Sequence, residues 1–276
     1  MILECGNRQL SLARPVVMGI LNTTPDSFSD GGRFNSLDQA LRHAEQMVLD
    51  GAGMIDVGGE STRPGADPVS VEEELQRVVP VVEAIAARLD VAISVDTSTP
   101  EVITASAAAG AHLINDVRAL ERPGALAAAA ASGLPVCLMH MKGKPDTMQD
   151  APAYDSVFDD VYCYLEQRIA ACLEAGIRRE LLVIDPGFGF GKTAVHNYEL
   201  LRRLAEFEAM KLPILTGLSR KRMIAEATGV EVADQRLIGS VTAAAICAMN
   251  GARIIRVHDV KETVEALKVV SATLGV

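Results

Sequence analysis

The stretch Ala92-Ile-Ser-Val-Asp-Thr97 shows the pattern that decides the fold, a short apolar strand that ends at polar side chains. Comparable apolar runs occur at residues 16–21, 54–57, 92–95, 113–115, 136–139, 182–184, 214–216 and 254–257. Nearly continuous apolar runs are typical of parallel strands that are covered on their outer face. Eight such strands with helical segments between them predict an α/β fold, a closed (β/α)8 TIM barrel whose site lies at the carboxyl ends of the strands.

The segments between the strands carry the start and stop signals of helices. Ser36 and Ser70 each precede a Gln or Glu by three positions, which is the pattern of a capping box. Thr99 followed by Pro100 suits the start of a helix. Apolar spacing over residues 155–175 predicts an amphipathic helix with one buried face. Left-handed helix ends are expected at Gly51, Gly110, Gly133 and Gly176.

The sequence predicts one domain over residues 1–276. No long linker rich in Pro, Gly or Ser and no block of charge divides the chain, which is long enough to bury a full core. The alternative fold is a doubly wound open sheet. That fold requires edge strands, and none of the eight runs has the polar character expected of an edge.

Composition excludes several classes of partner. A hydrophobic content of 49% and a charged content of 22% are typical of a globular protein. The formal net charge of −10 argues against a broad nucleic-acid surface. The 5 cysteines are scattered and form no C-x-x-C pair, so neither a disulfide framework nor a zinc site is indicated. With no secretory signal and no apolar run near about 18 residues, we expect a soluble cytoplasmic protein without a membrane partner.

Polar side chains follow most of the predicted strands. They are Asn22, residues 58–63, Asp96, residues 115–116, His140, Asp185, residues 219–221 and residues 256–258. Each alone has another interpretation, since Asp96 could cap a helix, Asn115 could be a turn residue and His140 could simply pack. Because such polar side chains recur at nearly every strand end, we predict that they form a single ring of hydrogen-bond donors and acceptors around the mouth of the barrel.

The basic members of this ring indicate a ligand that carries phosphate. Arg63, Lys221, Arg256 and His258 all follow strands, and a guanidinium offers a planar fork that suits phosphate. Arg256 ends an apolar run, where an unpaired cation would carry a large desolvation cost.

Two nearby segments have less specific interpretations. The glycine-rich run at residues 187–193 does not match a P-loop, because Pro186 stands where that motif needs its first glycine. We therefore expect a flexible loop there. Ser219 could cap the following helix or donate to a carboxylate, and the basic residues 220–222 could be only a solvated helix face.

Taken as strings, these residues closely resemble the dihydropteroate synthase family of folate biosynthesis. The matching segments are 18–32 (MGILNTTPDSFSDGG), 56–65 (DVGGESTRPG), 94–97, 114–117, 139–141 with 145–149, 184–192 (IDPGFGFGK), 217–221 and 256–259. They run in order from the first strand to the last. The most specific are those of the first two loops and of residues 185–192.

The resemblance implies a transferase of alkyl and aryl groups. Enzymes of this family join (7,8-dihydropterin-6-yl)methyl diphosphate to 4-aminobenzoate, with Mg²⁺ assisting, and release diphosphate and 7,8-dihydropteroate. Both substrates are small molecules, and the resemblance suggests a homodimer formed through the outer helices. A covalent nucleophile is not needed, so the cysteines receive no catalytic role.

The resemblance also implies roles for individual residues. The catalytic groups would be Asp96, Lys221 and Arg256. The pterin ring would be bound by Asp96, Asn115, Met139, Asp185, Phe190, Lys221 and Arg256. The diphosphate would be bound by Asn22, Thr62, Arg63, Arg256 and His258, with Asn22 also ligating Mg²⁺. The 4-aminobenzoate would be bound by Phe28, Thr62, Pro64, Phe190 and Ser219.

Two other functions remain open from the sequence. A barrel that transfers a methyl group from a reduced folate to a corrinoid would share the pterin contacts of Asp96, Asn115 and Asp185, but it would not need the full set of basic and hydroxyl groups. A non-catalytic relative would bind pterin without turning it over. A scaffold role would leave the ring of polar groups unexplained.

Overall fold

The structure is a computed structural model that describes residues 1–23, 33–60, 69–143, 148 and 152–276. Among these residues, eight parallel strands form one sheet in the order β8-β7-β6-β5-β4-β3-β10-β9. The strands are β3 (Val16–Asn22), β4 (Met54–Gly58), β5 (Ala92–Asp96), β6 (Leu113–Asp116), β7 (Val136–Met139), β8 (Leu182–Asp185), β9 (Leu215–Thr216) and β10 (Ile254–Val257). A parallel bridge between Ile184 and Ile214 joins the two ends of the sheet. The predicted closed barrel is thus confirmed, and the open-sheet alternative is wrong.

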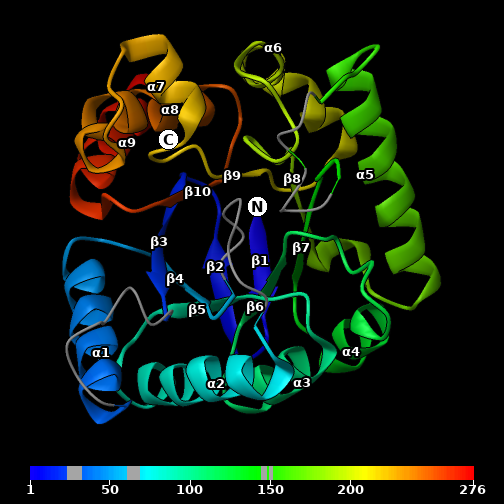
Figure 1. Cartoon of the computed structure of the whole chain (residues 1–276), viewed down its shortest axis with the longest axis vertical. Coiled ribbons are helices and arrows are strands. Elements are labelled where there is room, and N and C mark those ends of the chain that lie inside the picture. The colour runs from blue at the N-terminus through cyan, green and yellow to red at the C-terminus, as the bar shows by residue number, and fades with distance from the viewer. Residues whose placement is uncertain (24–32, 61–68, 144–147, 149–151) are drawn as a thin grey trace.

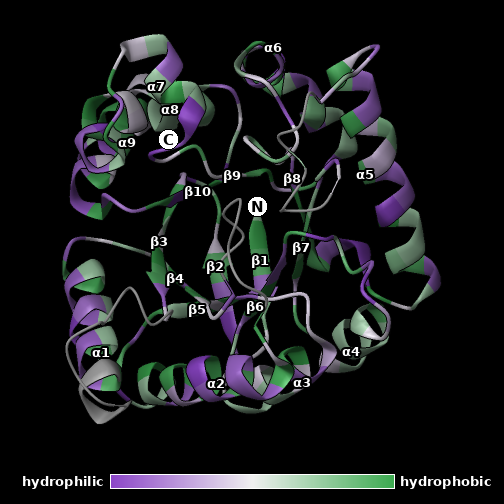
Figure 2. Cartoon of the chain, viewed as in Figure 1, coloured by the Kyte–Doolittle hydropathy of each residue, from purple (hydrophilic) through white to green (hydrophobic). Residues whose placement is uncertain are grey.

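Every predicted strand is present, with bounds that differ from the prediction by at most one residue. Helices surround the strands in Figure 1. They are α1 (Arg33–Leu49), α2 (Val71–Arg88), α3 (Pro100–Ala108), α4 (Ala125–Ser132), α5 (Val157–Glu174), α6 (Ala194–Arg202), α7 (Arg222–Thr228), α8 (Leu237–Met249) and α9 (Val260–Leu274). Short 3-10 helices are η2 (Arg179–Leu181), η3 (Leu204–Met210) and η4 (Ala233–Gln235). Figure 2 shows mainly apolar strands at the centre and helices of mixed polarity around them.

Most of the predicted helix ends are confirmed. The Ser70 hydroxyl accepts a hydrogen bond from the Glu73 amide, and Thr99 precedes a helix that begins with Pro100. The four glycines named above all have positive φ angles. The predicted start at Ser36 is wrong, because α1 begins at Arg33 and no glycine or proline stands between the two.

An N-terminal hairpin, which the sequence interpretation missed, closes the amino-terminal end of the barrel. Strands β1 (Ile2–Cys5) and β2 (Arg8–Ser11) pair in antiparallel fashion. The side chains of Leu3 and Cys5 are buried in one cluster with Met54 and Leu113, which occupy early positions in their strands. The hairpin therefore fills the bottom of the barrel with apolar side chains.

Strand register assembles the polar residues one layer higher. Asp56 pairs with Ser94, and Asp96 pairs with Asn115. Because inward-facing positions alternate along a strand, these residues lie above the apolar layer to which Met54 belongs. The interior thus changes from apolar at the amino end to polar at the carboxyl end.

Two further expectations concern the chain as a whole. No helix among the described residues is long and apolar enough to cross a membrane. That residues 1–276 form a single domain stays a prediction.

Candidate active site

Arg256 lies between two carboxylates at the carboxyl-terminal mouth of the barrel. Its Nε donates to Oδ2 of Asp56 at 2.6 Å, and its Nη2 donates to Oδ2 of Asp96 at 2.9 Å. Burial raises the pKa of Asp96 to about 7, and the charge of Arg256 opposes that rise. These two partners explain how a guanidinium is accommodated at the end of an apolar run.

Asp56 is the functional candidate that sequence reasoning missed. Its side chain is completely buried, and its Oδ1 accepts from the Ser94 hydroxyl at 2.5 Å. Its Oδ2 accepts from Nδ2 of Asn115 at 3.2 Å as well as from Arg256. A signal was present in the sequence, because an acid within an otherwise apolar strand requires buried donors.

Asp185 and Lys221 contribute a second pair of opposite charges. Asp185 is 6% exposed, and its Oδ1 accepts from the Gly187 amide at 2.7 Å. Burial raises the pKa of Asp185, although this amide and the charge of Lys221 oppose the rise. Burial lowers the pKa of Lys221 to about 8, with Asp185 opposing. The Lys221 ammonium donates to the carbonyl oxygen of Phe188 and lies 4.5 Å from the centre of the Phe190 ring.

The glycine-rich loop is held by a buried lysine. Lys192 donates to the carbonyl oxygens of Gly187 at 2.8 Å and Phe190 at 3.1 Å, and its Nζ lies 2.9 Å from Nδ1 of His140. The expectation of a flexible loop at residues 187–193 does not agree with this network. His140 is buried and packs within it, and burial lowers the pKa of its imidazole far below the usual range.

Ser219 contacts His258 rather than capping a helix. The two side chains meet at 3.0 Å between Oγ and Nδ1, and the His258 amide donates to the same hydroxyl at 3.2 Å. Helix α7 begins at Arg222 with Lys221 as its N-cap, so the predicted capping role of Ser219 is wrong. The reason is the left-handed turn at Arg220, which has a φ of 61° and separates Ser219 from the helix.

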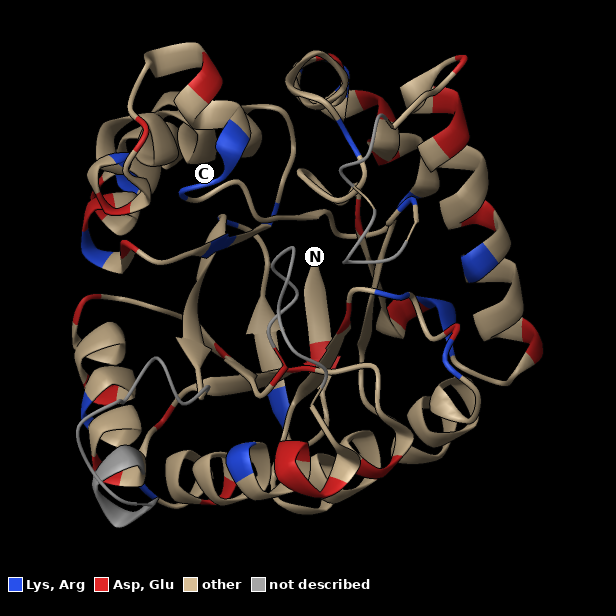
Figure 3. Cartoon of the chain, viewed as in Figure 1, with Lys and Arg blue, Asp and Glu red and all other residues tan. Residues whose placement is uncertain are grey.

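The basic residues 220–222 have three different surroundings. Arg220 forms an ion pair with Asp259 at 2.6 Å, and the exposed Arg222 pairs with Glu226 at 3.0 Å. Lys221 alone of the three is packed against the glycine-rich loop. The interpretation as a solvated face therefore holds for Arg222 only. Figure 3 shows acidic and basic residues interspersed along the outer helices.

The remaining predicted residues divide between the mouth and the undescribed segments. Asn22 is half-buried at the end of β3, and its Oδ1 and the Oδ2 of Asp96 flank the same glycine, Gly58. Met139 is buried at the end of β7, where it pairs with Asp185. Outside the described residues lie Phe28, Thr62, Arg63 and Pro64.

The donor set suits a magnesium ion that is shared with a ligand. Among the described residues, no group of three or more His, Cys, Asp or Glu side chains could hold a metal ion. Asn22 does offer an amide oxygen, which borders Gly58 as the Asp96 carboxylate does. Mg²⁺ prefers oxygen, keeps several waters and often binds through substrate phosphates. An amide oxygen such as that of Asn22 therefore fits an ion of this kind that a ligand shares with the protein.

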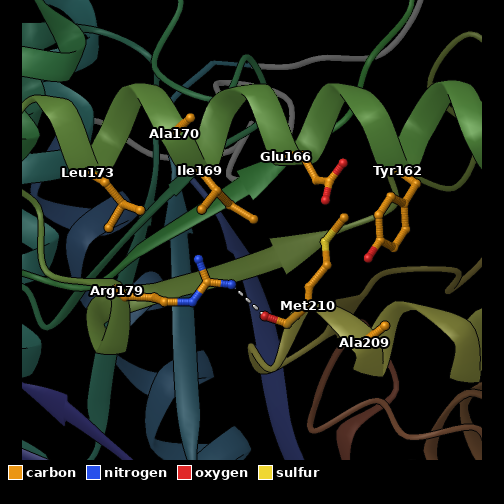
Figure 4. Close-up of a pocket in the computed structure, with 8 residues that line it drawn as sticks. All are labelled: Tyr162, Glu166, Ile169, Ala170, Leu173, Arg179, Ala209 and Met210. Atoms are coloured by element: carbon orange, nitrogen blue, oxygen red, sulfur yellow. Dashed lines mark hydrogen bonds between the residues drawn. The ribbon is translucent and has the colours of Figure 1, made fainter.

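A cavity of about 260 Å³ lies elsewhere, on the outer wall among α5, η2 and η3 (Figure 4). Arg179 donates to the carbonyl oxygen of Met210 at 2.7 Å beside it. Arg179 belongs to η2, which directly precedes β8, so the cavity is near the amino-terminal side of the barrel. None of the predicted site residues lines it, and it is separate from the mouth.

The closed barrel and its polar mouth define a pterin-binding enzyme, and the family model with the description "Pterin binding enzyme" matches residues 18–258. The chain is 64% identical over 266 residues to the dihydropteroate synthase of Escherichia coli K12, covering 96% of this chain and 94% of that protein. It belongs to the dihydropteroate synthase family, whose members are transferases. The Yersinia pestis enzyme, solved in a sulfonamide drug complex, superposes with a TM-score of 0.95 at 59% identity, over 100% of both chains. The Xanthomonas albilineans enzyme, solved in complex with 7,8-dihydropteroate, gives a TM-score of 0.92 at 48% identity, again over 100% of both chains.

Proposed function

We propose that the protein joins (7,8-dihydropterin-6-yl)methyl diphosphate to 4-aminobenzoate, forming 7,8-dihydropteroate and releasing diphosphate. The observation that carries the proposal is the grouping of three acceptors, Asp96, Asn115 and Asp185, on strands β5, β6 and β8 of one mouth. The related Xanthomonas albilineans enzyme holds 7,8-dihydropteroate, which is the product of this reaction.

The acceptors suit the hydrogen-bonding edge of a pterin ring. The amino-oxo-pyrimidine edge of a pterin carries N–H donors beside one carbonyl acceptor. Asp185, Asn115 and Asp96 would take the donors, and the Lys221 ammonium would donate to the carbonyl oxygen. Phe190 and Met139 would cover the ring, since Phe190 lies beside the Lys221 ammonium and Met139 pairs with Asp185.

The diphosphate would bind on the other arc of the mouth. Asn22 ends β3, His258 follows β10, and these two strands are neighbours in the sheet. Arg256 uses Nε and Nη2 for its carboxylates, which leaves Nη1 to donate to the diphosphate. The loop residues Thr62 and Arg63 would complete this set. A bound Mg²⁺ would supply positive charge to the diphosphate oxygens, with Asn22 holding it.

The reaction requires the protein to orient the two substrates and to stabilise the charges that develop on the ring and on the departing diphosphate. A pterin ring can delocalise positive charge from the methylene carbon, so diphosphate can depart before the amine attacks. Lys221, Arg256 and Asp96 would fix the ring and stabilise the charges that develop. Ser219 and Phe190, with Phe28, Thr62 and Pro64, would bind 4-aminobenzoate so that its amino group faces the methylene carbon.

Direct assay tests the proposal. Incubation with both substrates and Mg²⁺ should yield diphosphate and 7,8-dihydropteroate in equal amounts, measured by a coupled phosphate assay and by chromatography. Lys221→Met, which keeps an unbranched side chain up to Cε but removes the charged Nζ, should lose most of this activity. Diphosphate release no faster than without protein would remove the transferase proposal. Pterin binding without any 4-aminobenzoate binding in the presence of diphosphate would instead favour a non-catalytic binder.

We also propose that the protein is a cytoplasmic homodimer. The adjacent helices α8 and α9 expose large apolar side chains, among them Ile238 at 82%, Met249 at 48% and Val269 at 68%. Apolar exposure of this kind is typical of an interface between subunits. Light scattering coupled to size-exclusion chromatography should give twice the chain mass of 29.3 kDa, and a single-chain mass at micromolar concentration would contradict the dimer.

A further inference from the structure

We infer that Asp56, which lies below the proposed ligand, is a positioning residue that decides which atoms of Asn115 and Arg256 face the ring. This inference rests on the proposed function only for the identity of the ring. The structural basis of the inference is the Asp56 carboxylate and the three side chains that donate hydrogen bonds to it, which are Ser94, Asn115 and Arg256.

An ionised carboxylate only accepts hydrogen bonds, so it fixes the orientation of an amide beside it. Nδ2 of Asn115 lies 3.2 Å from Oδ2 of Asp56 and must be its amino group, because the carbonyl oxygen would meet another acceptor. The amide oxygen Oδ1 of Asn115 is thereby left for a different donor. The exocyclic amino group of a pterin is a donor of this kind.

The same carboxylate fixes the plane of the Arg256 guanidinium. Nε is bound at 2.6 Å by Asp56 and Nη2 at 2.9 Å by Asp96, so two donors on one edge of the rigid guanidinium are held by two different strands. Without Asp56, the guanidinium could rotate about its remaining bond to Asp96. Nη1 would then lose its fixed direction toward the diphosphate.

The burial of Asp56 argues that it acts through these neighbours. Its side chain is 0% exposed, whereas that of Asp96 is 13% exposed at the same mouth. The Ser94 hydroxyl occupies Oδ1 at 2.5 Å, and Oδ2 takes two donors. Asp56 therefore presents no exposed surface to a ligand, and its influence passes through Asn115 and Arg256.

The chain offers a matched control in Asp116. Its carboxylate is also 0% exposed, and it likewise accepts three hydrogen bonds, from the Ser98 hydroxyl and the amides of Arg118 and Leu120. It follows Asn115 in β6 and therefore points to the opposite face of the sheet. Asp116→Ala removes a buried carboxylate with as many hydrogen-bond donors as Asp56 has, without touching Asn115 or Arg256.

The test compares two phosphate-free probes, 6-hydroxymethylpterin and its analogue without the 2-amino group, by calorimetry. The wild-type protein should prefer the pterin, and Asp56→Ala, which removes both acceptor oxygens, should lower that preference by about tenfold, since a site built for a donor loses one oriented acceptor. Asp116→Ala should keep the wild-type preference. In steady-state assays Asp56→Ala should also lower kcat, because Arg256 no longer holds the diphosphate in a fixed direction.

A preference in Asp56→Ala equal to that of the wild type, or an equal loss in both variants, overturns the inference. Should Asp56→Ala fail to fold, Ser94→Ala keeps the carboxylate but removes one of its three donors. That variant must then lower the preference by about threefold, or the inference is overturned. Both probes lack the diphosphate, so a loss of preference in a protein without transferase activity would support the role of Asp56 and remove only the proposed reaction.

Discussion

Asp185 gives the sharpest test of the site, because its two carboxylate oxygens have separate partners. Oδ1 accepts from the Gly187 amide at 2.7 Å and so holds the start of the glycine-rich loop. The other oxygen is left for a ligand donor. Asp185→Asn keeps an acceptor for the amide and replaces the ligand-facing oxygen with a donor. Asp185→Ala removes both.

The magnitude follows from these contacts. A hydrogen bond to a charged group contributes about 1.5–3 kcal/mol, and each 1.4 kcal/mol changes a dissociation constant tenfold. Asp185→Asn should therefore weaken the binding of 6-hydroxymethylpterin by about 10- to 150-fold. Its free energy of unfolding should change less than that of Asp185→Ala, which leaves the buried Gly187 amide without its acceptor and should lose about 1–3 kcal/mol.

Calorimetry with 6-hydroxymethylpterin measures the affinity, and urea denaturation measures the stability. Asp116→Asn serves as the control for a buried carboxylate outside the mouth, and its affinity for the pterin should match the wild type. An affinity in Asp185→Asn within threefold of the wild type would show that Asp185 does not contact the ring. Equal stability losses in both Asp185 variants would contradict the separate role of Oδ1.

Three further outcomes are expected. Ser219→Ala should raise the KM for 4-aminobenzoate several-fold in steady-state assays and leave that of the pterin substrate nearly unchanged, and the reverse pattern would exclude Ser219 from the aminobenzoate pocket. The affinity for phosphate-free pterin should be highest between about pH 7 and 8. Asp96, with its raised pKa of about 7, takes up a proton below that range, and Lys221, with its lowered pKa of about 8, loses one above it. Calorimetry that shows constant affinity over several pH units on either side would contradict this expectation. Gly187→Ala should lower the free energy of unfolding by about 2–3 kcal/mol in urea denaturation. The glycine has a φ of 71°, and an added Cβ would lie 1.9 Å from the carbonyl oxygen of His140. A loss below about 0.5 kcal/mol would refute that clash.

The barrel could be predicted from the sequence because its signal is local. Each strand is a short apolar run, and the residue that ends it, such as Asp96 or Asp185, stands at the predicted position within one residue. Parallel strands of a barrel place their carboxyl ends at one rim, so residues that end different strands are expected to lie near one another. The strands and the residues at their ends could therefore be predicted from the periodicity of the sequence alone.

What the sequence interpretation missed depends on contacts between distant residues. Asp56 and Arg256 are 200 positions apart, and an acid inside a strand does not indicate which cation it meets. Ser219 precedes a helix at a plausible capping distance, yet the left-handed turn at Arg220 directs its hydroxyl to His258. The hairpin over residues 2–11 was missed because its first strand buries only Leu3 and Cys5 among Ile2 to Cys5, so it lacks the continuous apolar run of the barrel strands.

Binding an anion beside three carboxylates requires that their charges be compensated locally, and the order of strands shows how this is done. Asp56 and Asp96 share Arg256, while Asp185 is near the charge of Lys221. The carboxylates come from β4, β5 and β8, whereas Asn22 ends β3 and His258 directly follows β10, the neighbour of β3 in the sheet. A ligand with a donor-rich ring at one end and a diphosphate at the other can therefore lie across the mouth with each end against the groups that suit it. Arg256 belongs to β10 but donates to carboxylates on β4 and β5, and it therefore connects the ring side of the mouth with the diphosphate side. A substitution of Asp56 should consequently weaken the binding of both the ring and the diphosphate.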